Sequence, residues 1–402
     1  MDGFRDAAPG VRTTGAVPMT RHTVPVSILY STTGAYASLG REALAGAMAA
    51  ISEVNADSSL AFRIEPRIDD PAGRAERYAL LSEAAIRDHG CRHVIGTITS
   101  WSRKDVLPIV ERRGALLWYG FPYEGYEASE SAIYLGACPN QHLLPLFDHM
   151  LPRYGQRPFI VGSNYIWGWE INRLAREVTE AAGGQVVAER FVPLGSTEIE
   201  HLIAEIHQKQ PDFVLCNLVG ESATAFIAAY HALRETVSVP PVATCNVTEL
   251  ELENLDVPAR AGHISTSIYF DDLDTPENRD FKARMALRHG RERRLTTSFV
   301  GAYMSVSILA RAIADAATDA PDAIRGTVTS RLFDTPIGQV GIDPRTQHAS
   351  LRPHLAFSDR NGEFRIISSA PAAIEADPFL VHALGKPAVG RDNTGTVLKV
   401  IK

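Results

Sequence analysis

The feature that most constrains the fold is a repeated alternation of short apolar runs with stretches of helical periodicity. Residues 24–30 are typical of a strand, and apolar residues at positions 44, 47, 48, 51 and 54 then share one face of a helix. Further apolar runs at 62–68, 94–96 and 116–119 are separated by helical patterns. This alternation predicts βαβ units and a parallel sheet.

The alternation begins again after Pro139. Strands are expected at 159–162, 186–191, 213–217 and 242–243, with helices between them. From Gly262 onward the pattern loosens into extended segments and two further helices. A chain of 402 residues is too long for one compact core, so the sequence predicts two similar α/β halves.

Charge and cysteine content exclude several classes of protein. The net charge of -7 argues against non-specific binding of nucleic acid, and there is no helix-turn-helix or basic arm that would read DNA directly. Cys91, Cys138, Cys216 and Cys245 show no CxxC spacing and no disulfide framework. Cys216 ends an apolar run and is expected to be a buried thiol.

The N-terminal segment bears on localisation. Residues 1–22 lack the continuous apolar stretch of a secretory signal, and Met19 is an alternative start directly before the first strand. No run approaches the length of a membrane span. The sequence therefore predicts a cytoplasmic protein, or a periplasmic one if a signal has been removed.

Catalytic motifs are absent from the sequence. It contains no Gly-x-Ser-x-Gly elbow, no phosphate-binding P-loop and no Gly-x-Gly-x-x-Gly. His89, Cys91 and His93 have no fourth partner at a zinc spacing, and Asp69 and Asp70 would point to opposite faces of an extended segment. We expect no catalytic residue, no metal site, no cofactor and no enzymatic activity.

A cluster of aromatic residues follows the strand expected at 159–162. Tyr165, Trp167 and Trp169 lie between that strand and the next helix. In open α/β sheets, ligands bind outside the carboxyl ends of the strands, so these residues indicate one wall of a pocket. Ordinary core packing is the alternative for each of them. For Tyr165 a ligand role is favoured because a buried hydroxyl needs a partner.

Four segments, at residues 27–34, 69–73, 119–125 and 162–165, together resemble one family. It is the type I periplasmic-binding-protein family, in the branch of the amide receptor that regulates aliphatic amidase expression. Urea and short-chain amide binding proteins of transporters are close to that branch. The resemblance runs from about Val24 to about Leu384, nearly the whole chain.

The resemblance implies an α/β fold of two lobes, each a mostly parallel sheet flanked by helices, with three crossovers at the hinge. It places lobe one at residues 24–141 and 271–330 and lobe two at 142–270 and 331–384. Residues 1–23 and 385–402 are then tails.

The resemblance also implies a ligand held by loops at strand ends. The expected ligand-binding residues are Ile98, Thr99, Ser100, Tyr119, Phe121, Pro122, Tyr165 and Glu221. Tyr165 would donate to a ligand carbonyl, and Glu221 could accept from an N–H or ammonium group unless it is a solvated acid of a first helical turn. Ile98 and Phe121 stand where the receptor has a tyrosine and a threonine. This difference does not favour acetamide itself but leaves small amide-like ligands open.

Two classes of function follow. The first is a cytoplasmic sensor of a small amide or urea-like molecule that controls a protein partner of the antiterminator type. The second is the substrate-binding component of an ABC transporter for urea, short-chain amides or branched-chain amino acids, with a permease as partner. The missing signal segment favours the first class, and a homodimer is left open.

Overall fold

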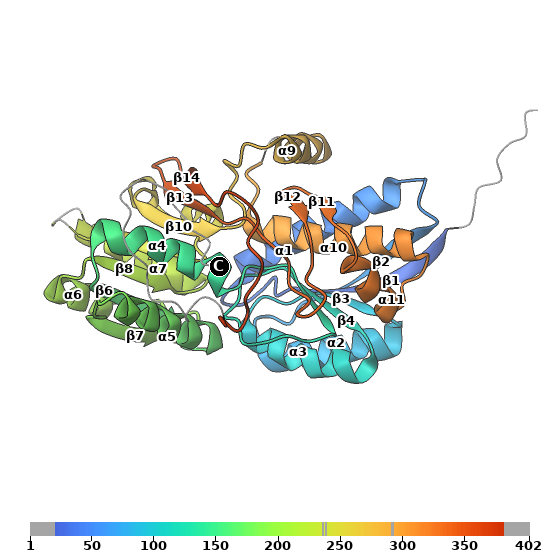
Figure 1. Cartoon of the computed structure of the whole chain (residues 1–402), viewed down its shortest axis with the longest axis horizontal. Coiled ribbons are helices and arrows are strands. Elements are labelled where there is room, and N and C mark those ends of the chain that lie inside the picture. The colour runs from blue at the N-terminus through green and yellow to red at the C-terminus, as the bar shows by residue number, and fades with distance from the viewer. Residues whose placement is uncertain (1–20, 235–236, 238, 291–292, 382–402) are drawn as a thin grey trace, which may run out of the picture.

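The computed structural model describes residues 21–234, 237, 239–290 and 293–381, which form two lobes, each with its own sheet (Figure 1). In the first lobe five parallel strands lie in the order β2-β1-β3-β4-β5. Their bounds are β1 His22–Leu29, β2 Phe62–Asp69, β3 His93–Gly96, β4 Leu116–Tyr119 and β5 Ala132–Tyr134. Burial on both faces explains the nearly continuous apolar runs that predict β3 and β4.

Helices cover both faces of this sheet (Figure 1). Helices α1 (Ala37–Ala56) and α10 (Thr297–Ala316) pack on each other, and α2 (Ala75–His89) and α3 (Ser100–Arg113) pack together on the opposite side. By length and composition α10 could cross a membrane, but 78% of its most apolar window is buried in the protein. Helix α10 is therefore a core helix of the first lobe, and α11 (Pro321–Val328) packs against it.

The second lobe contains a sheet of seven strands in the order β14-β13-β10-β9-β8-β6-β7. Strands β6 to β10 are parallel, and β13 and β14 add an antiparallel edge. The strand bounds are β6 Pro158–Ser163, β7 Ala188–Val192, β8 Phe213–Asn217, β9 Val242–Thr244, β10 His263–Ser267, β13 His354–Ser358 and β14 Phe364–Ser369. The helices are α4 Leu143–Tyr154, α5 Ile166–Ala181, α6 Glu200–Lys209, α7 Glu221–Arg234 and α8 Glu249–Glu253.

The chain passes between the two sheets three times. It leaves the first sheet after β5, returns from β10 through α9 (Pro276–His289) to α10, and crosses again between α11 and β13. The last stretch contains a hairpin of β11 (Phe333–Thr335) and β12 (Gly338–Val340). The predicted two-lobe fold is thus confirmed, and the loss of regular alternation after Gly262 reflects these returns.

The predicted strands and helices are present, whereas β5, α8 and α11 were not foreseen because they are short. The expectations for Met19 and for both tails lie at least partly outside the described residues. The residue boundaries proposed for the two lobes stay a prediction.

Two glycines place the start of α10 beside the loop that follows β4. A Cβ atom on Gly301 would lie 2.5 Å from the carbonyl oxygen of Gly120. A Cβ atom on Gly120 would lie 2.9 Å from the backbone carbonyl group of Gly301. Only residues without a side chain allow this approach of helix and loop. It brings the first turn of α10 to the edge of the sheet where the polypeptide leaves β4.

Candidate functional site

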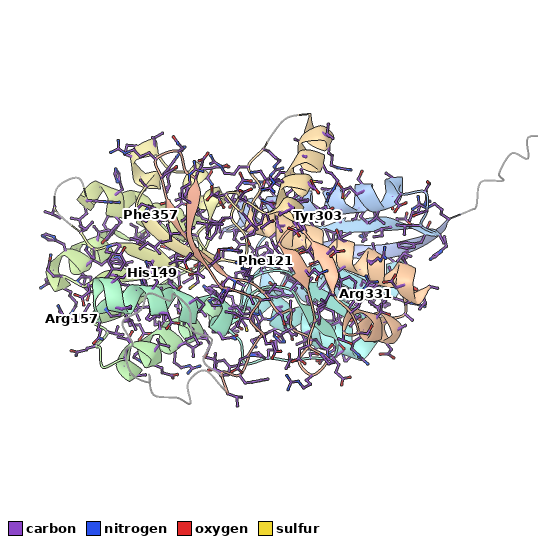
Figure 2. All side chains as sticks on the ribbon, turned by 45° about the horizontal axis from the view of Figure 1, so that its top comes forward. Phe121, His149, Arg157, Tyr303, Arg331 and Phe357 are labelled. Carbon is purple, nitrogen blue, oxygen red and sulfur yellow. The ribbon has the colours of Figure 1, made fainter. Side chains whose placement is uncertain are left out.

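A cavity of about 60 Å³ lies between the lobes, at the carboxyl ends of parallel strands from both sheets. Figure 2 shows one of its residues, Phe121, near the middle of the molecule. One ordered water needs about 10–15 Å³ by the same measure, so the cavity suits a small molecule. The residues that line it are Leu39, Ile98, Ser100, Tyr119, Gly120, Phe121, Pro122, Gly136, Ala137, His142, Tyr165, Trp167, Val219, Cys245, Asn246, Thr248, Thr266, Ser267, Ile268, Thr297 and Ser298.

Six of the eight residues expected to bind a ligand lie in this wall: Ile98, Ser100, Tyr119, Phe121, Pro122 and Tyr165. Thr99 and Glu221 do not line it. The hydroxyl of Thr99 caps helix α3 by accepting from the backbone N–H of Ser102, and Glu221 is an exposed acid in the first turn of α7. Neither side chain faces the cavity, and ligand binding by the other six stays a prediction.

The wall on the first lobe holds two hydroxyl groups that donate to the protein. The hydroxyl of Tyr119 donates to the carbonyl oxygen of Ile98 at 2.8 Å. The hydroxyl of Ser100 donates to Oε2 of Glu124 at 2.5 Å. Burial raises the pKa of Tyr119, so its phenol keeps its proton.

Behind these hydroxyls lies an ion network built on Arg103, whose side chain is fully buried. Its guanidinium donates to Glu124 at 2.7 Å and to Glu127 at 2.8 Å, and Lys104 donates to Glu127 at 2.9 Å. The guanidinium carbon also lies 4.8 Å from the ring centre of Tyr119, within cation–π range. Although burial opposes the charged form, Arg103 lowers the pKa of Glu127 to about 2.

The wall on the second lobe presents polar atoms that have no partner among the described residues. They include the indole N–H of Trp167 and the hydroxyl of Thr266, both buried. Tyr165 is 3% exposed, and its hydroxyl makes no hydrogen bond within the described part of the chain. Burial raises the pKa of Tyr165 well above its usual value, so the group is a donor. A ligand acceptor would satisfy these groups.

His142 lies on the crossover that follows β5. Its Nε2 donates to the carbonyl oxygen of Tyr123 at 3.1 Å, and burial lowers its pKa to about 4. The ring is therefore neutral at pH 7, and the other nitrogen, Nδ1, is an acceptor. That nitrogen is buried and unpaired within the described residues. His142 thus adds one acceptor to a wall that Trp167 supplies with a donor.

In the part of the chain that the structure describes, the wall of the cavity is uncharged, and its one thiol is protonated. Among the described residues, none that lines it is an Asp, Glu, Lys or Arg. The four cysteines are buried free thiols, as expected for Cys216, and burial raises the pKa of the lining Cys245. A protonated thiol is a weak nucleophile. The arrangement suits reversible binding.

Aromatic side chains meet across the rim of the cavity. Trp101 on α3 lies 5.4 Å from the ring of Tyr165 and 6.5 Å from that of Trp169, in edge-on geometry. Trp101 is 37% exposed and Trp169 is 43% exposed. These contacts join helix α3 of the first lobe to α5 of the second.

Sequence reasoning missed several lining residues. Thr266 and Asn246 could have been found by the rule that ligands bind at strand ends, because each lies at or just beyond a strand end in the second sheet. Thr297 and Ser298 carry no such signal. They reach the cavity from the start of α10, which only the return crossover brings there.

Comparison with known proteins found a family model that matches most of the chain. A family model described as a periplasmic binding protein domain matches residues 24–384. A fragment of 124 residues is 27% identical to a limonene hydroxylase from Geobacillus stearothermophilus, covering 31% of this chain. The matched fragment spans 23% of that relative's length.

Solved structures share the fold. A solute-binding protein of an ABC transporter from Rhodopseudomonas palustris, in complex with p-hydroxybenzoic acid, has a TM-score of 0.79 at 21% identity, covering 89% of this chain and 99% of that one. An amino acid ABC transporter substrate-binding protein from Pseudomonas fluorescens has a TM-score of 0.77 at 17% identity, covering 89% and 97%. A leucine-binding protein from Thermotoga maritima gives 0.74 at 16% identity, covering 86% and 98%.

These comparisons confirm the predicted family and fold, and they do not confirm the amide-receptor branch. The structural relatives named above are binding proteins, two of them components of ABC transporters. The expected cytoplasmic location is not supported. The family and its structural relatives are ligand-binding proteins.

Proposed function

The chain belongs to the periplasmic binding protein family, and we propose that it is the substrate-binding component of an ABC transporter for a small carbonyl compound, either an amide or an aromatic acid. The observation that carries the proposal is the uncharged cavity between the lobes, with aromatic rings and unpaired hydrogen-bonding atoms in one wall. A buried pocket of this kind binds a small ligand by enclosing it.

The wall favours a ligand with a carbonyl oxygen. Helices α3, α5 and α10 begin at the cavity, through Ser100, Tyr165 and Thr297. The free N–H groups of a first helical turn and the positive end of the helix dipole attract oxygen acceptors. Trp167 and Tyr165 add side-chain donors, and the rings of Tyr119 and Phe121 can cover an apolar portion.

The same wall disfavours free amino acids. An amino acid brings an ammonium group, and a buried ammonium needs a carboxylate partner. Glu221, the one acid that the sequence analysis expects to accept from an ammonium group, is exposed on α7 and does not line the cavity. Leucine and related amino acids are therefore weaker candidates than amides or aromatic acids.

Titration calorimetry of the purified chain against benzamide, acetamide, urea, benzoate, 4-hydroxybenzoate and leucine tests the proposal. We expect saturable binding of at least one amide or aromatic acid, and no binding of leucine. Binding of leucine alone would reject the proposed ligand class. Release of ammonia from an amide would make the protein an enzyme.

The transporter role has a separate test. We expect the native protein to fractionate with periplasmic markers and to have a permease as its partner. Recovery with cytoplasmic markers would instead favour a cytoplasmic sensor that regulates a protein partner. The homodimer stays a prediction, which sedimentation of the purified protein with and without ligand would check.

A further inference from the structure

Two residues that line the cavity, Ser100 and Tyr119, each use their only hydroxyl proton in a hydrogen bond within the protein. Ser100 donates to Oε2 of Glu124 at 2.5 Å, and Tyr119 donates to the carbonyl oxygen of Ile98 at 2.8 Å. A carboxylate and a carbonyl oxygen can only accept. Toward the cavity, both hydroxyl oxygens are therefore left with lone pairs and act as acceptors.

Residues outside the cavity determine where the hydroxyl of Ser100 donates its proton. Glu124 is 1% exposed, and its other oxygen accepts from Arg103 at 2.7 Å. Arg103 is itself fully buried and also bonded to Glu127. In this ion pair the guanidinium can only donate, so the carboxylate of Glu124 accepts from Arg103 and from Ser100 alike. Ser100 is therefore the donor to Glu124.

We propose that Glu124, held by Arg103, makes this site select ligands that present an N–H or O–H group to Ser100 and Tyr119, so that a primary amide binds in preference to the matching carboxylate. This inference rests on the proposed function. The NH2 group of an amide satisfies the two acceptors, while its carbonyl oxygen takes a helix N–H or a donor such as Tyr165.

A carboxylate in the same place has no proton to offer. Its oxygens would meet the lone pairs of Ser100 and Tyr119, with the negative charge of Glu124 directly behind Ser100. The helix ends still attract it, so the discrimination is between two ligands that both fit in shape. Glu124 is a positioning residue, since it acts on the ligand through Ser100 and does not itself line the cavity.

The test compares matched ligands, benzamide with benzoate and acetamide with acetate, at pH 7 by calorimetry. We expect the unaltered protein to prefer the amide by about tenfold to a hundredfold, the value of one satisfied buried hydrogen bond. In Glu124→Gln the amide oxygen stays on Arg103, so its NH2 donates to Ser100 and frees the serine proton. The preference should fall at least about tenfold.

The matched control is Glu127→Gln, which alters the same arginine without touching Ser100. It should leave the amide-to-carboxylate ratio within about twofold. Ser100→Ala should lower the ratio by itself, and adding Glu124→Gln to it should change the ratio no further, because the acid acts through the serine. Melting curves identify any variant that fails to fold, and Ser100→Ala then carries the test.

The outcomes separate the two proposals. If the unaltered protein binds carboxylates better than amides in both pairs, or if Glu124→Gln folds and leaves the ratio unchanged, this inference is overturned while the transporter proposal stands. If the unaltered protein binds 4-hydroxybenzoate but neither benzamide nor acetamide, the inference is likewise overturned. If it binds none of the four probes and neither urea nor 4-hydroxybenzoate, the proposed ligand class fails, and the selection inferred from it fails as well.

Discussion

The two walls of the cavity differ in how their polar groups are satisfied. On the first lobe, Ser100 and Tyr119 are hydrogen-bonded and supported by the ion network of Arg103. On the second lobe, the indole of Trp167 and the hydroxyl of Thr266 are buried without a partner in the described part of the chain. The first wall is therefore satisfied within the protein, and the second would be satisfied by a ligand.

This difference explains how binding can be linked to closure of the lobes. An unpaired buried donor costs about 1–3 kcal/mol, and this cost is present when the lobes are closed without a ligand. A ligand that satisfies such donors lowers the free energy of the closed form more than that of the open form. Differential affinity of this kind shifts the population toward closure.

The buried carboxyl groups of the two lobes differ as well. Glu124 and Glu127 in the first lobe are paired with Arg103. In the second lobe, burial raises the pKa of Glu249 to about 8 and that of Glu251 to about 7. The first lobe thus pairs its acids with a cation, and the second holds acids whose pKa burial raises.

The largest effect is expected from breaking the network of the first lobe. Arg103→Ala leaves Glu124 and Glu127 buried without their guanidinium, and should destabilise the fold by about 3–5 kcal/mol in urea unfolding. The control is Lys104→Ala, because Lys104 is 38% exposed and should cost about 0–1 kcal/mol. Equal small losses in the two variants would show that the network does not support this wall.

The next effect concerns the donor of the second wall. Tyr165→Phe removes only the hydroxyl, so the melting temperature should hardly change while affinity falls by about 1–3 kcal/mol, roughly tenfold to a hundredfold. Calorimetry and melting curves on the same variant measure both. Tyr154→Phe, on the exposed side of α4, is the control. A variant that loses stability but keeps its affinity would place Tyr165 in the core and outside the site.

The protonated carboxyls predict a dependence on pH. Because burial raises the folded pKa of Glu249 and Glu251 above the ordinary value of 4.5, the stability that they contribute is complete below that value, falls as pH rises above it, and is lost once pH passes 7 to 8. Buried histidines such as His142, with a pKa of about 4, are neutral in this window and do not contribute. Urea unfolding at pH 6.5 and pH 8 should show a loss of about 2 kcal/mol.

Substitution of both carboxyls tests this assignment. In Glu249→Gln with Glu251→Gln, the stability difference between pH 6.5 and pH 8 should largely disappear, since the amides do not titrate. A difference as large as in the unaltered protein would show that other groups carry the dependence and that the second lobe does not hold these protons.

The smallest effect is expected at the rim. Trp101→Ala removes the edge-on contacts with Tyr165 and Trp169, which together should contribute about 0.5–1.5 kcal/mol because both indoles are partly exposed. Ligand dissociation, followed by stopped flow, should accelerate about twofold to tenfold. Leu80→Ala, exposed on α2, should leave the rate unchanged. An unchanged rate in Trp101→Ala would mean that these rings do not hold the lobes together.

Much of the fold follows from local patterns in the sequence. The apolar runs that became β3, β4 and β6 are buried on both faces of their sheets, so hydrophobicity alone marks them. The strand ends that carry Ser100, Tyr119 and Tyr165 follow from the same patterns, and Tyr165 also follows from the rule that ligands bind at strand ends. The choice of Ser100 and Tyr119 as ligand-binding residues came from the family resemblance. Each of these signals lies within one short stretch of chain.

The contacts between such stretches depend on the tertiary structure. Sequence could name Ser100, but its role as an acceptor depends on Glu124, 24 positions away, and on the burial of Arg103. Ser298 reaches the cavity only because α10 returns to the first lobe. Glu221 is excluded because its own side chain is exposed, although Val219, two residues earlier, lines the cavity. Periodicity records whether a side chain is buried, whereas the partner of a buried polar group depends on packing between distant segments.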